Sequence, residues 1–405
     1  MTTADAADRP TPLSTPISAG IVASLVGFTS SFAVVLTALR EVGAGPTEAA
    51  SGLVALCVVQ AVGMMWLARR YRQPITLAWS TPGAALLAGT GVVVGGWPAA
   101  VGAFVTVGVL IFLTGLWPAL GALVSRIPIP LAQAMLAGVL LPLCAAPVVG
   151  FADSPAQVAP VVLVWLVVLR FEARWAVPAA FAAAAAVIAA DLISDGTPIA
   201  ASDLVPRIDW TVPHWTWQAT VGIAIPLYIV TMASQNIPGT TVMASFGYRI
   251  PWRAAMTVTG TGTVLGAFAG GHAINLAAIS AALSANPGAH PDPRRRWIAA
   301  FSAGCSFLGL ALLSTALATL VAAAPAGVVE TVAGLALLGT LATSLFGALQ
   351  HAPDREAAVL TFLVASSGLT FAGIGSAFWA LVAGLVVRAI LGRQSPALPT
   401  SENTD

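Results

Sequence analysis

The fold is decided by the stretch Pro74-Ile75-Thr76-Leu77-Ala78-Trp79-Ser80-Thr81-Pro82-Gly83-Ala84-Ala85-Leu86-Leu87. Its first part favours an extended strand, because branched and aromatic side chains suit a pleated backbone. Ser80 and Thr81 then resemble a helix N-cap, and Pro82 fits the first helical turn, where its missing N–H costs nothing. The stretch therefore predicts a short strand followed by a half-helix. Such backbone survives within a membrane only where protein surrounds it or where it lines a cavity, and a helix start attracts anions.

A weaker copy of this pattern lies about two hundred residues further on, at Ile274-Asn275-Leu276-Ala277-Ala278-Ile279-Ser280. It shares Ile, Leu and Ala with the first stretch at three matching positions. Two ordinary transmembrane segments that tolerate Pro and Ser are the alternative explanation, and the two stretches alone do not decide between them.

Composition places the chain in a membrane. Of the 405 residues 58% are hydrophobic and 8% are charged, with a mean hydropathy of +0.90. No soluble domain has this profile, so the chain is expected to cross the lipid bilayer many times. The net charge of +1 excludes a nucleic-acid partner, and the three cysteines have no metal-ligand spacing.

Fourteen apolar segments can be counted along the chain. They span approximately residues 17–39, 47–68, 74–90, 98–124, 128–147, 154–170 and 175–194, and then 218–246, 252–270, 272–286, 297–323, 327–349, 355–372 and 375–391. Adding 199 to the starts 98, 128, 154 and 175 gives 297, 327, 353 and 374, so the two sets share their spacing. This predicts an internal duplication of seven segments. Because seven is odd, the second copy enters from the opposite face, as an inverted repeat.

The predicted organisation is a cytoplasmic tail over 1–16, a first repeat over 17–194, an outside connecting loop over 195–217, a second repeat over 218–391 and a cytoplasmic tail over 392–405. Arginine placement tests the count. All 17 basic residues are arginines, and with a cytoplasmic N-terminus only Arg40 and Arg207 fall outside. That distribution satisfies the positive-inside rule and predicts that both termini are cytoplasmic.

Polar side chains within apolar segments are the candidate binding residues. Ser234, Gln235 and Asn236 follow one another in the eighth segment, and Pro238-Gly239 is expected to break the helix just after them. Ser30 and Ser31 form a similar patch in the first segment. Uncharged polar groups within a membrane need partners, which are either neighbouring helices or a ligand. Helix packing is therefore the alternative explanation for each patch, and Asn275 either bonds the facing strand or lines the site.

Few ionisable groups lie within the segments. His272 stands beside the second strand-like stretch and is the first candidate for proton exchange, because histidine titrates near physiological pH. Glu330, early in the twelfth segment, is the second. A histidine bonded to a loop carbonyl and a solvated glutamate at a helix end are the structural alternatives. No arginine lies mid-span, so an anion would be held by half-helix starts, hydroxyls and amides. The sequence has no hydrolase, nucleotide-binding or zinc motif. We therefore expect that the protein is not an enzyme and binds no cofactor.

Several stretches resemble the benzoate/proton symporter family of BenE type. They are residues 78–87, 134–138, 230–236 with Pro238-Gly239, 289–292, 333–338 and 373–379, and the resemblance covers nearly the whole chain. It implies uptake of benzoate or a close aromatic carboxylate across the inner membrane, driven by protons. The family is similar in plan to nucleobase–ascorbate transporters, which implies a core domain from the first four segments of each half and a gate domain from the last three. The resemblance also implies a possible homodimer, formed through the gate domains.

The sequence departs from those transporters at one point. They place an acidic residue in the eighth segment near the substrate, whereas Ser234-Gln235-Asn236 occupies that region here. Their scheme of proton coupling therefore does not transfer directly.

The combined prediction is an all-α polytopic membrane protein that imports an aromatic carboxylate with protons by alternating access. The carboxylate is expected at the half-helix start, with the aromatic ring against apolar walls. The predicted substrate-binding residues are Phe28, Ser30, Ser31, Trp79, Ser80, Thr81, Gly83, Gln235, Asn236, Asn275 and Ser280. The same fold carrying a nucleobase or an inorganic anion is the alternative, followed by a passive channel or a membrane enzyme.

Overall fold

A computed structural model describes residues 12–117, 119–121, 126–195 and 204–391. The predicted tails over 1–16 and 392–405 therefore lie almost wholly outside the described residues. The regular elements of the described chain are helices apart from two three-residue strands, β1 (Leu77–Trp79) and β2 (Ile274–Leu276). The strands pair antiparallel, with Ala78 opposite Asn275. Segments about two hundred residues apart thus meet at one ladder in the interior.

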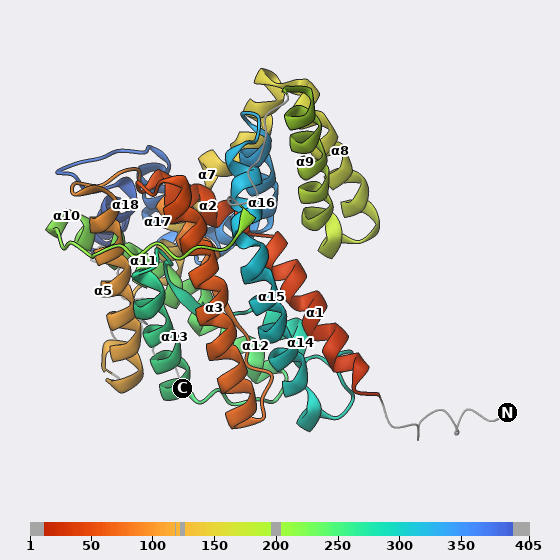
Figure 1. Ribbon diagram of the computed structural model, residues 1–405. Coiled ribbons are helices and arrows are strands. Elements are labelled where there is room, and N and C mark those ends of the chain that lie inside the picture. Colours follow the sequence, from red (N-terminus) through yellow and green to blue (C-terminus); the bar gives the residue numbers. More distant parts are fainter. Residues whose placement is uncertain (1–11, 118, 122–125, 196–203, 392–405) are drawn as a thin grey trace, which may run out of the picture.

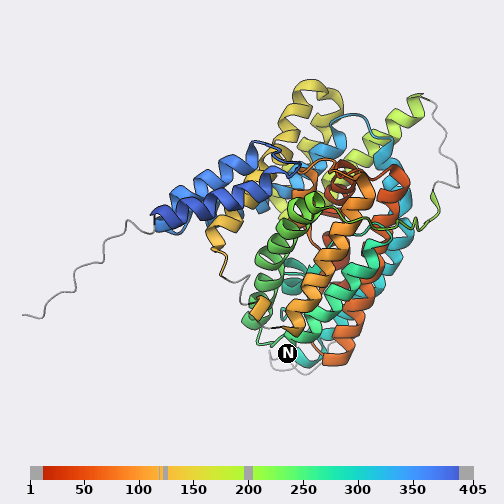
Figure 2. The same ribbon diagram turned by 90° about the vertical axis from the view of Figure 1, so that its left-hand side faces the viewer.

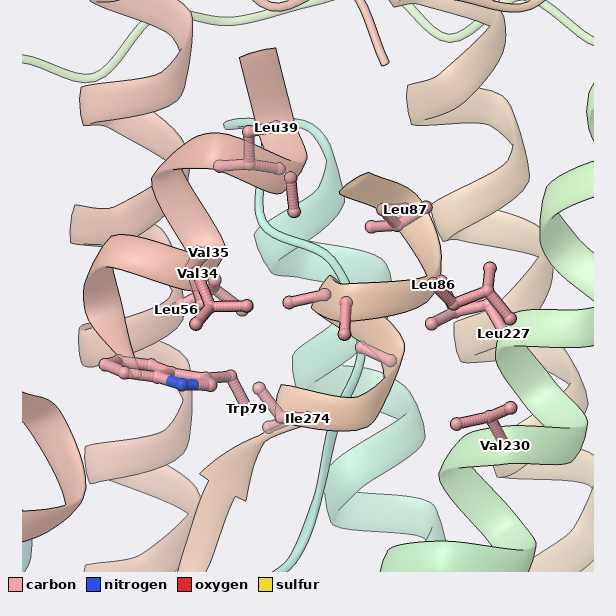
Figure 3. Packing of buried hydrophobic residues seen from close by; sticks show 14 of the residues in the cluster. Val34, Val35, Leu39, Leu56, Trp79, Leu86, Leu87, Leu227, Val230 and Ile274 are labelled. Carbon is pink, nitrogen blue, oxygen red and sulfur yellow. The ribbon is translucent and has the colours of Figure 1, made fainter. Parts of the chain in front are cut away.

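Each strand leads into a short helix, as the sequence predicts. β1 is followed by α4 (Thr81–Ala88) and β2 by α14 (Ile279–Ala285). The ladder extends beyond the strands, because the Ser80 N–H donates to the Ala273 carbonyl at 2.9 Å and the Ala277 N–H donates to the Thr76 carbonyl at 3.0 Å. The backbone groups that a strand leaves unpaired in the interior are thereby satisfied. Apolar side chains of α2 (Phe32–Glu41) and α11 (Ile225–Thr231) surround α4, with Leu86 lying against Leu227 in Figure 3.

A first helix group packs around this ladder. It comprises α1 (Ser14–Thr29), α2 (Phe32–Glu41), α3 (Pro46–Tyr71), α4, α5 (Gly96–Leu116), the long helix from Trp217 to Ser245, α13 (Trp252–Ala267), α14 and α15 (Trp297–Ala322). α3 packs along α15, α13 along α5, and α1 along α15. Glycines permit the close approach of α13 and α5: a Cβ on Gly108 would lie 2.7 Å from the Val264 backbone nitrogen. Figure 1 shows α1, α3, α5, α13 and α15 of this group running side by side through the lower half of the molecule.

A second helix group lies beside the first. It comprises α7 (Ile129–Asp153), α8 (Pro155–Phe171), α9 (Ala173–Asp195), α16 (Val328–Leu349), α17 (Arg355–Ser366) and α18 (Ser376–Leu391). α7 packs against α16 and α17, and α8 packs against α9. Figure 2 shows α17 and α18, in dark blue, projecting together from the rest. α16 and α7 also reach the first group, through contacts with α2 and α4 respectively.

The fourteen predicted segments agree with these elements to within a few residues at most boundaries. Eight described helices are long and apolar enough to cross a membrane, and the shorter apolar helices Pro155–Phe171 and Ser376–Leu391 add to them. The first predicted segment is divided at Ser30–Ser31 into α1 and α2, and two others are strand plus half-helix. The chain is therefore a mostly helical, multi-pass membrane protein. The count of fourteen crossings and the inverted repeat stay predictions.

The predicted break at Pro238-Gly239 is wrong. The eighth segment is helical from Trp217 to Ser245, and α12 (Ile237–Ser245) runs through the proline. The preceding turn, Met232–Asn236, is a π-helix, and a second π turn lies at Thr220–Ala224. A π turn accommodates one extra residue, so the missing N–H of a proline and its bulky ring are tolerated without ending the helix. The helix is therefore widened at the turn that carries the side chains of Gln235 and Asn236.

The described part of the connecting loop is held against the first helix group by hydrogen bonds. Over the described residues 204–216 its backbone is bonded to the first helix group: the Asp209 N–H donates to Ser51 Oγ at 2.8 Å and the His214 N–H donates to the Pro98 carbonyl at 2.9 Å. Trp97 Nε1 donates to Thr211 Oγ1 at 2.9 Å. The loop is thereby a strap across the ends of α3 and α5.

Candidate functional site

A cavity of about 150 Å³ opens where the two half-helices begin. β1, α4, the π turn before α12, the residues between β2 and α14, and α14 itself contribute to its wall, together with α1, α3 and α15 from the first helix group and α16 from the second. Its lining residues are Ala23, Val26, Gly27, Ser30, Ser31, Gln60, Ala78, Trp79, Thr81, Pro82, Gln235, Ala277, Ala278, Ser280, Leu283, Phe307, Ala336 and Thr340. The cavity therefore lies at the boundary between the two helix groups.

The start of α4 confirms the predicted cap. Ser80 is fully buried, and its Oγ accepts a hydrogen bond from the Gly83 N–H at 3.1 Å. The Thr231 hydroxyl donates to the same Ser80 Oγ at 2.9 Å, which ties α4 to α11 (Ile225–Thr231). Pro82 has no N–H, and the Ala84 N–H bonds the Ser80 carbonyl. Much of this helix start is thus satisfied by the protein itself, and Thr81 is the cap-region residue that faces the cavity.

Aromatic rings form one wall. Trp79 is buried, and its Nε1 donates to Ser31 Oγ at 2.8 Å. Its ring meets Phe28 at 5.7 Å and Phe307 at 6.1 Å between centroids, both edge to face. Edge-to-face pairs fix the relative orientation of rings and present apolar surface, which suits a flat aromatic ligand. The Trp79–Ser31 bond also joins β1 to the break between α1 and α2.

Six of the predicted binding residues line the cavity. They are Ser30, Ser31, Trp79, Thr81, Gln235 and Ser280, and they come from the break between α1 and α2, β1, α4, the π turn and α14. Ser30 and Ser31 also bond the Gly27 carbonyl, at 3.0 and 3.2 Å. The structure thus brings together polar groups that the sequence holds up to 250 residues apart.

The other five predicted residues lie behind the lining. Asn236 is buried, its Oδ1 accepts from the Leu276 N–H at 2.9 Å, and the π turn is thereby fixed to β2. Asn275 donates to the Leu276 carbonyl at 2.8 Å. A Cβ on Gly83 would strike Leu227 Cδ1, so this glycine permits α4 and α11 to touch. With Ser80 as the cap and Phe28 against Trp79, these residues position the wall.

The two proton-coupling candidates lie away from the cavity lining. His272 is fully buried, and its ring packs against Phe104 at 6.4 Å between centroids. Glu330 is in the first turn of α16, where its Oε2 accepts from the Gly327 N–H at 3.1 Å. Ala336 and Thr340, the α16 residues that line the cavity, follow Glu330 by six and ten positions, which corresponds to about 9 and 15 Å along a helix.

Sequence reasoning missed twelve of the eighteen lining residues, of which three have polar or aromatic side chains. Gln60 lies in the middle of α3, Phe307 in α15 and Thr340 in α16. Gln60 carried the strongest signal, because it is a lone amide within a span of otherwise small and apolar residues. Phe307 and Thr340 have sequence neighbours that are ordinary for a membrane helix, so the sequence gave no signal for either residue.

The cavity is electrically neutral. None of the described lining residues is titratable, and the described chain holds no group of three or more His, Cys, Asp or Glu that fits a metal. Hydroxyls and amides can donate and accept hydrogen bonds, and the rings can contact an apolar body. Such a site can hold a small amphipathic molecule in a fixed orientation, with its polar end toward the half-helix starts.

Comparison with known proteins places the chain in a family. The model of the benzoate membrane transport protein family, BenE, matches residues 10–390. The chain belongs to this family. Inner membrane protein YdcO of Escherichia coli is 37% identical over 373 residues, which cover 92% of this chain and 95% of that protein. The benzoate membrane transport protein of Acinetobacter baylyi is 28% identical, over 92% and 94% of the two chains. This is a family of membrane transporters and not of enzymes.

Solved structures share the fold at low sequence identity. The transmembrane domain of a cyanobacterium bicarbonate transporter, BicA, superposes with a TM-score of 0.58 at 14% sequence identity. The superposition covers 94% of this chain and 97% of the BicA chain. Murine Slc26a9, an anion transporter in the inward-facing state, gives a TM-score of 0.63 at 14% identity, over 96% of this chain and 69% of its own. These likenesses establish the fold class of the membrane domain.

Proposed function

We propose that this protein imports benzoate or a related aromatic carboxylate together with protons, by alternating access across the inner membrane. The observation that carries the proposal is the neutral cavity at the two half-helix starts, with aromatic rings on one wall and hydroxyl and amide groups on the others. Family membership supports the transport activity, and the Acinetobacter relative is named for benzoate. Localisation in the inner membrane is supported by the name of the Escherichia coli relative.

In this proposal the polar end of the substrate lies at the start of α4, near Thr81, and faces Ser280 of α14. Gln235 contributes amide hydrogen bonds. The ring of the substrate lies against Trp79 and Phe307, because both line the cavity and meet edge to face. Burying an aromatic ring there favours binding by about 25 cal/mol for each Å² removed from water.

The architecture proposed for the transport cycle follows from the two helix groups. The first helix group corresponds to a core domain and the second to a gate domain, and the cavity lies between them. Antiparallel pairing of β1 with β2 supports an inverted repeat, since two copies that enter from opposite faces would present their strands in opposite directions. Both termini would be cytoplasmic, with Arg40 and Arg207 outside, and a homodimer through the second helix group stays a prediction.

Binding of labelled benzoate to the purified protein in lipid nanodiscs tests the site. We expect saturable binding that unlabelled aromatic carboxylates displace, and weaker binding by Gln235→Ala and Ser80→Ala variants that remain monodisperse. Gln133→Leu is the matched control, because Gln133 lies on α7 outside the cavity lining. Unchanged affinity in both site variants would refute this placement.

Transport of another solute by the same fold is the second candidate. The observation that favours it is the order of identities: the 37% identical relative is named only as an inner membrane protein, and the benzoate transporter is more distant at 28%. Displacement of bound benzoate by a nucleobase or by bicarbonate, at lower concentrations than any aromatic carboxylate, would support it. The same experiment therefore separates the two candidates.

A further inference from the structure

Gln60 is a buried amide without a hydrogen-bond partner in the part of the chain that the structure describes. It lies at the middle of α3, its side chain is fully buried, and it lines the cavity. Among the described residues neither Oε1 nor Nε2 has a hydrogen-bond partner. A buried polar group left without a partner is strongly unfavourable, so such a group in a cavity wall points to a ligand. The conclusion holds for either orientation of the amide, because both of its ends are free.

The position of Gln60 brings it beside the first half-helix. α3 packs against β1, the strand that leads directly into α4. One turn further along α3, a Cβ on Gly63 would lie 2.8 Å from Leu77 Cδ1. Ala78 and Trp79, which complete β1, line the same cavity as Gln60. The amide therefore reaches the cavity close to the place where the carboxyl group of the proposed substrate lies.

The chemistry of an amide distinguishes the two forms of a carboxyl group. A primary amide presents a donor N–H and an acceptor oxygen on one edge, whereas a carboxylate contains only acceptors. A carboxylate would satisfy Nε2 and leave Oε1 facing a negative charge. A protonated carboxyl group satisfies both, because its O–H donates to Oε1 while its carbonyl oxygen accepts from Nε2.

Electrostatics favours the same form. The described lining has no cation, and Ser80, held by the Thr231 hydroxyl, already caps the Gly83 N–H at the α4 start. An ionised carboxylate without a partner charge is expensive to bury, and such groups bind a proton instead. Resting on the function proposed above, we propose that Gln60 binds the substrate carboxyl group in its protonated form, so that the coupled proton travels on the substrate.

The proton balance is simple. Outside, the carboxylate takes one proton and an O–H bond forms; inside, that bond breaks and the proton is released with the carboxylate. The protein needs no titratable group at the site, which accounts for a lining without one. Charge is balanced throughout, because one anion and one proton cross together.

Titratable and charged groups on the elements around Gln60 lie away from the cavity lining. They are Glu48, Cys57, Arg69, Arg70 and Tyr71 of α3, Arg40 and Glu41 of α2, Arg253 of α13, Cys305 of α15 and Glu330 of α16, together with His272 beside β2. Cys57 bonds Ser314, Arg70 lies over the Tyr71 ring, and His272 packs against Phe104. α1, β1, α4 and α14 carry none of these residue types.

Binding at different pH values tests the inference on the wild-type protein. Dissociation constants of benzoate and of benzamide are measured in nanodiscs between about pH 5 and pH 8. Benzamide carries a donor and an acceptor like the neutral acid but does not titrate, so it also controls for titration of the protein. We expect benzamide to compete with benzoate and to bind equally at all pH values. The dissociation constant of total benzoate should rise about tenfold for each pH unit, since a carboxylic acid has a pKa near 4.

The variant Gln60→Met assigns the effect to this residue. It keeps the length of the side chain and removes both hydrogen bonds, so benzoate and benzamide should each bind about tenfold more weakly or worse, whereas Gln133→Leu should not differ from the wild type. Benzoate binding that does not change with pH and that benzamide does not displace would overturn the inference but not the proposed substrate. Loss in Gln60→Met of affinity for ring-hydroxylated benzoates alone would also overturn it. Absence of benzoate binding at every pH would overturn both proposals.

Discussion

The hydroxyl group of Ser80 is the structural link that holds the first half-helix, and its removal has a calculable cost. In Ser80→Ala the Gly83 N–H loses its cap and the buried Thr231 hydroxyl loses its acceptor. Loss of an N-cap costs about 1 kcal/mol. Leaving the Thr231 donor unpaired costs about 1–2 kcal/mol more, because Thr231 is fully buried. The expected destabilisation is therefore about 2–3 kcal/mol.

A double-mutant cycle separates the two contributions. Thr231→Val removes the donor that Ser80→Ala leaves unpaired, so the double variant should be more stable than the sum of the single variants predicts, by about 1 kcal/mol. The free energy of unfolding is measured in mixed micelles by circular dichroism. Ser245→Ala is the matched control, because Ser245 is exposed and its hydroxyl donates to the Val242 carbonyl within the same helix; it should stay within about 0.5 kcal/mol of the wild type. A Ser80→Ala variant as stable as that control, without coupling to Thr231, would refute the reasoning.

Three further changes have expected outcomes, two in the same unfolding assay and one in a proteolysis assay. Trp79→Phe removes the bond to Ser31 and should cost about 1 kcal/mol, with no added loss when combined with Ser31→Ala; additive losses would contradict a direct bond. Asn236→Leu leaves the Leu276 N–H of β2 without its acceptor and should lower the free energy of unfolding by about 1–3 kcal/mol. An unchanged free energy of unfolding would disprove this role. Arg296→Gln removes donors to the carbonyl oxygens of Ala285, His290 and Pro291 and should increase proteolysis of the loop between α14 and Arg296, whereas exposed Arg294→Gln should not; equal cleavage would argue against it.

The strand and half-helix were predictable because their signals are local. Branched residues before Ser80 and a proline just after it specify a strand and a capped helix start without reference to the rest of the chain. The second copy was found through its offset in the sequence. The pairing of Ala78 with Asn275 then follows from bringing the two copies together.

The errors have physical causes beyond the local sequence. Pro238 was expected to end a helix, but a π turn at Met232–Asn236 absorbs the distortion, and no local rule marks where an extra residue will be accommodated. Asn236 and Gln235 are adjacent and chemically similar. Only the packing of the π turn against β2 decides that Asn236 bonds the Leu276 N–H while Gln235 lines the cavity.

Gln60 shows what tertiary packing adds. A single amide in an apolar helix is commonly satisfied by a neighbouring helix. The absence of such a partner among the described residues, and the meeting of α3 with β1, become visible only in three dimensions. The same holds for Phe307, whose contact with Trp79 joins α15 to the ligand-facing wall.

Uptake of labelled benzoate into proteoliposomes, with and without an inward proton gradient, tests the central claim most directly. Leakage of neutral benzoic acid through protein-free liposomes is subtracted. A proton-coupled importer predicts accumulation above this leak that depends on the gradient and that other aromatic carboxylates inhibit. Uptake no greater than the leak, by protein shown to be folded, would contradict the claim and assign the cavity to another solute.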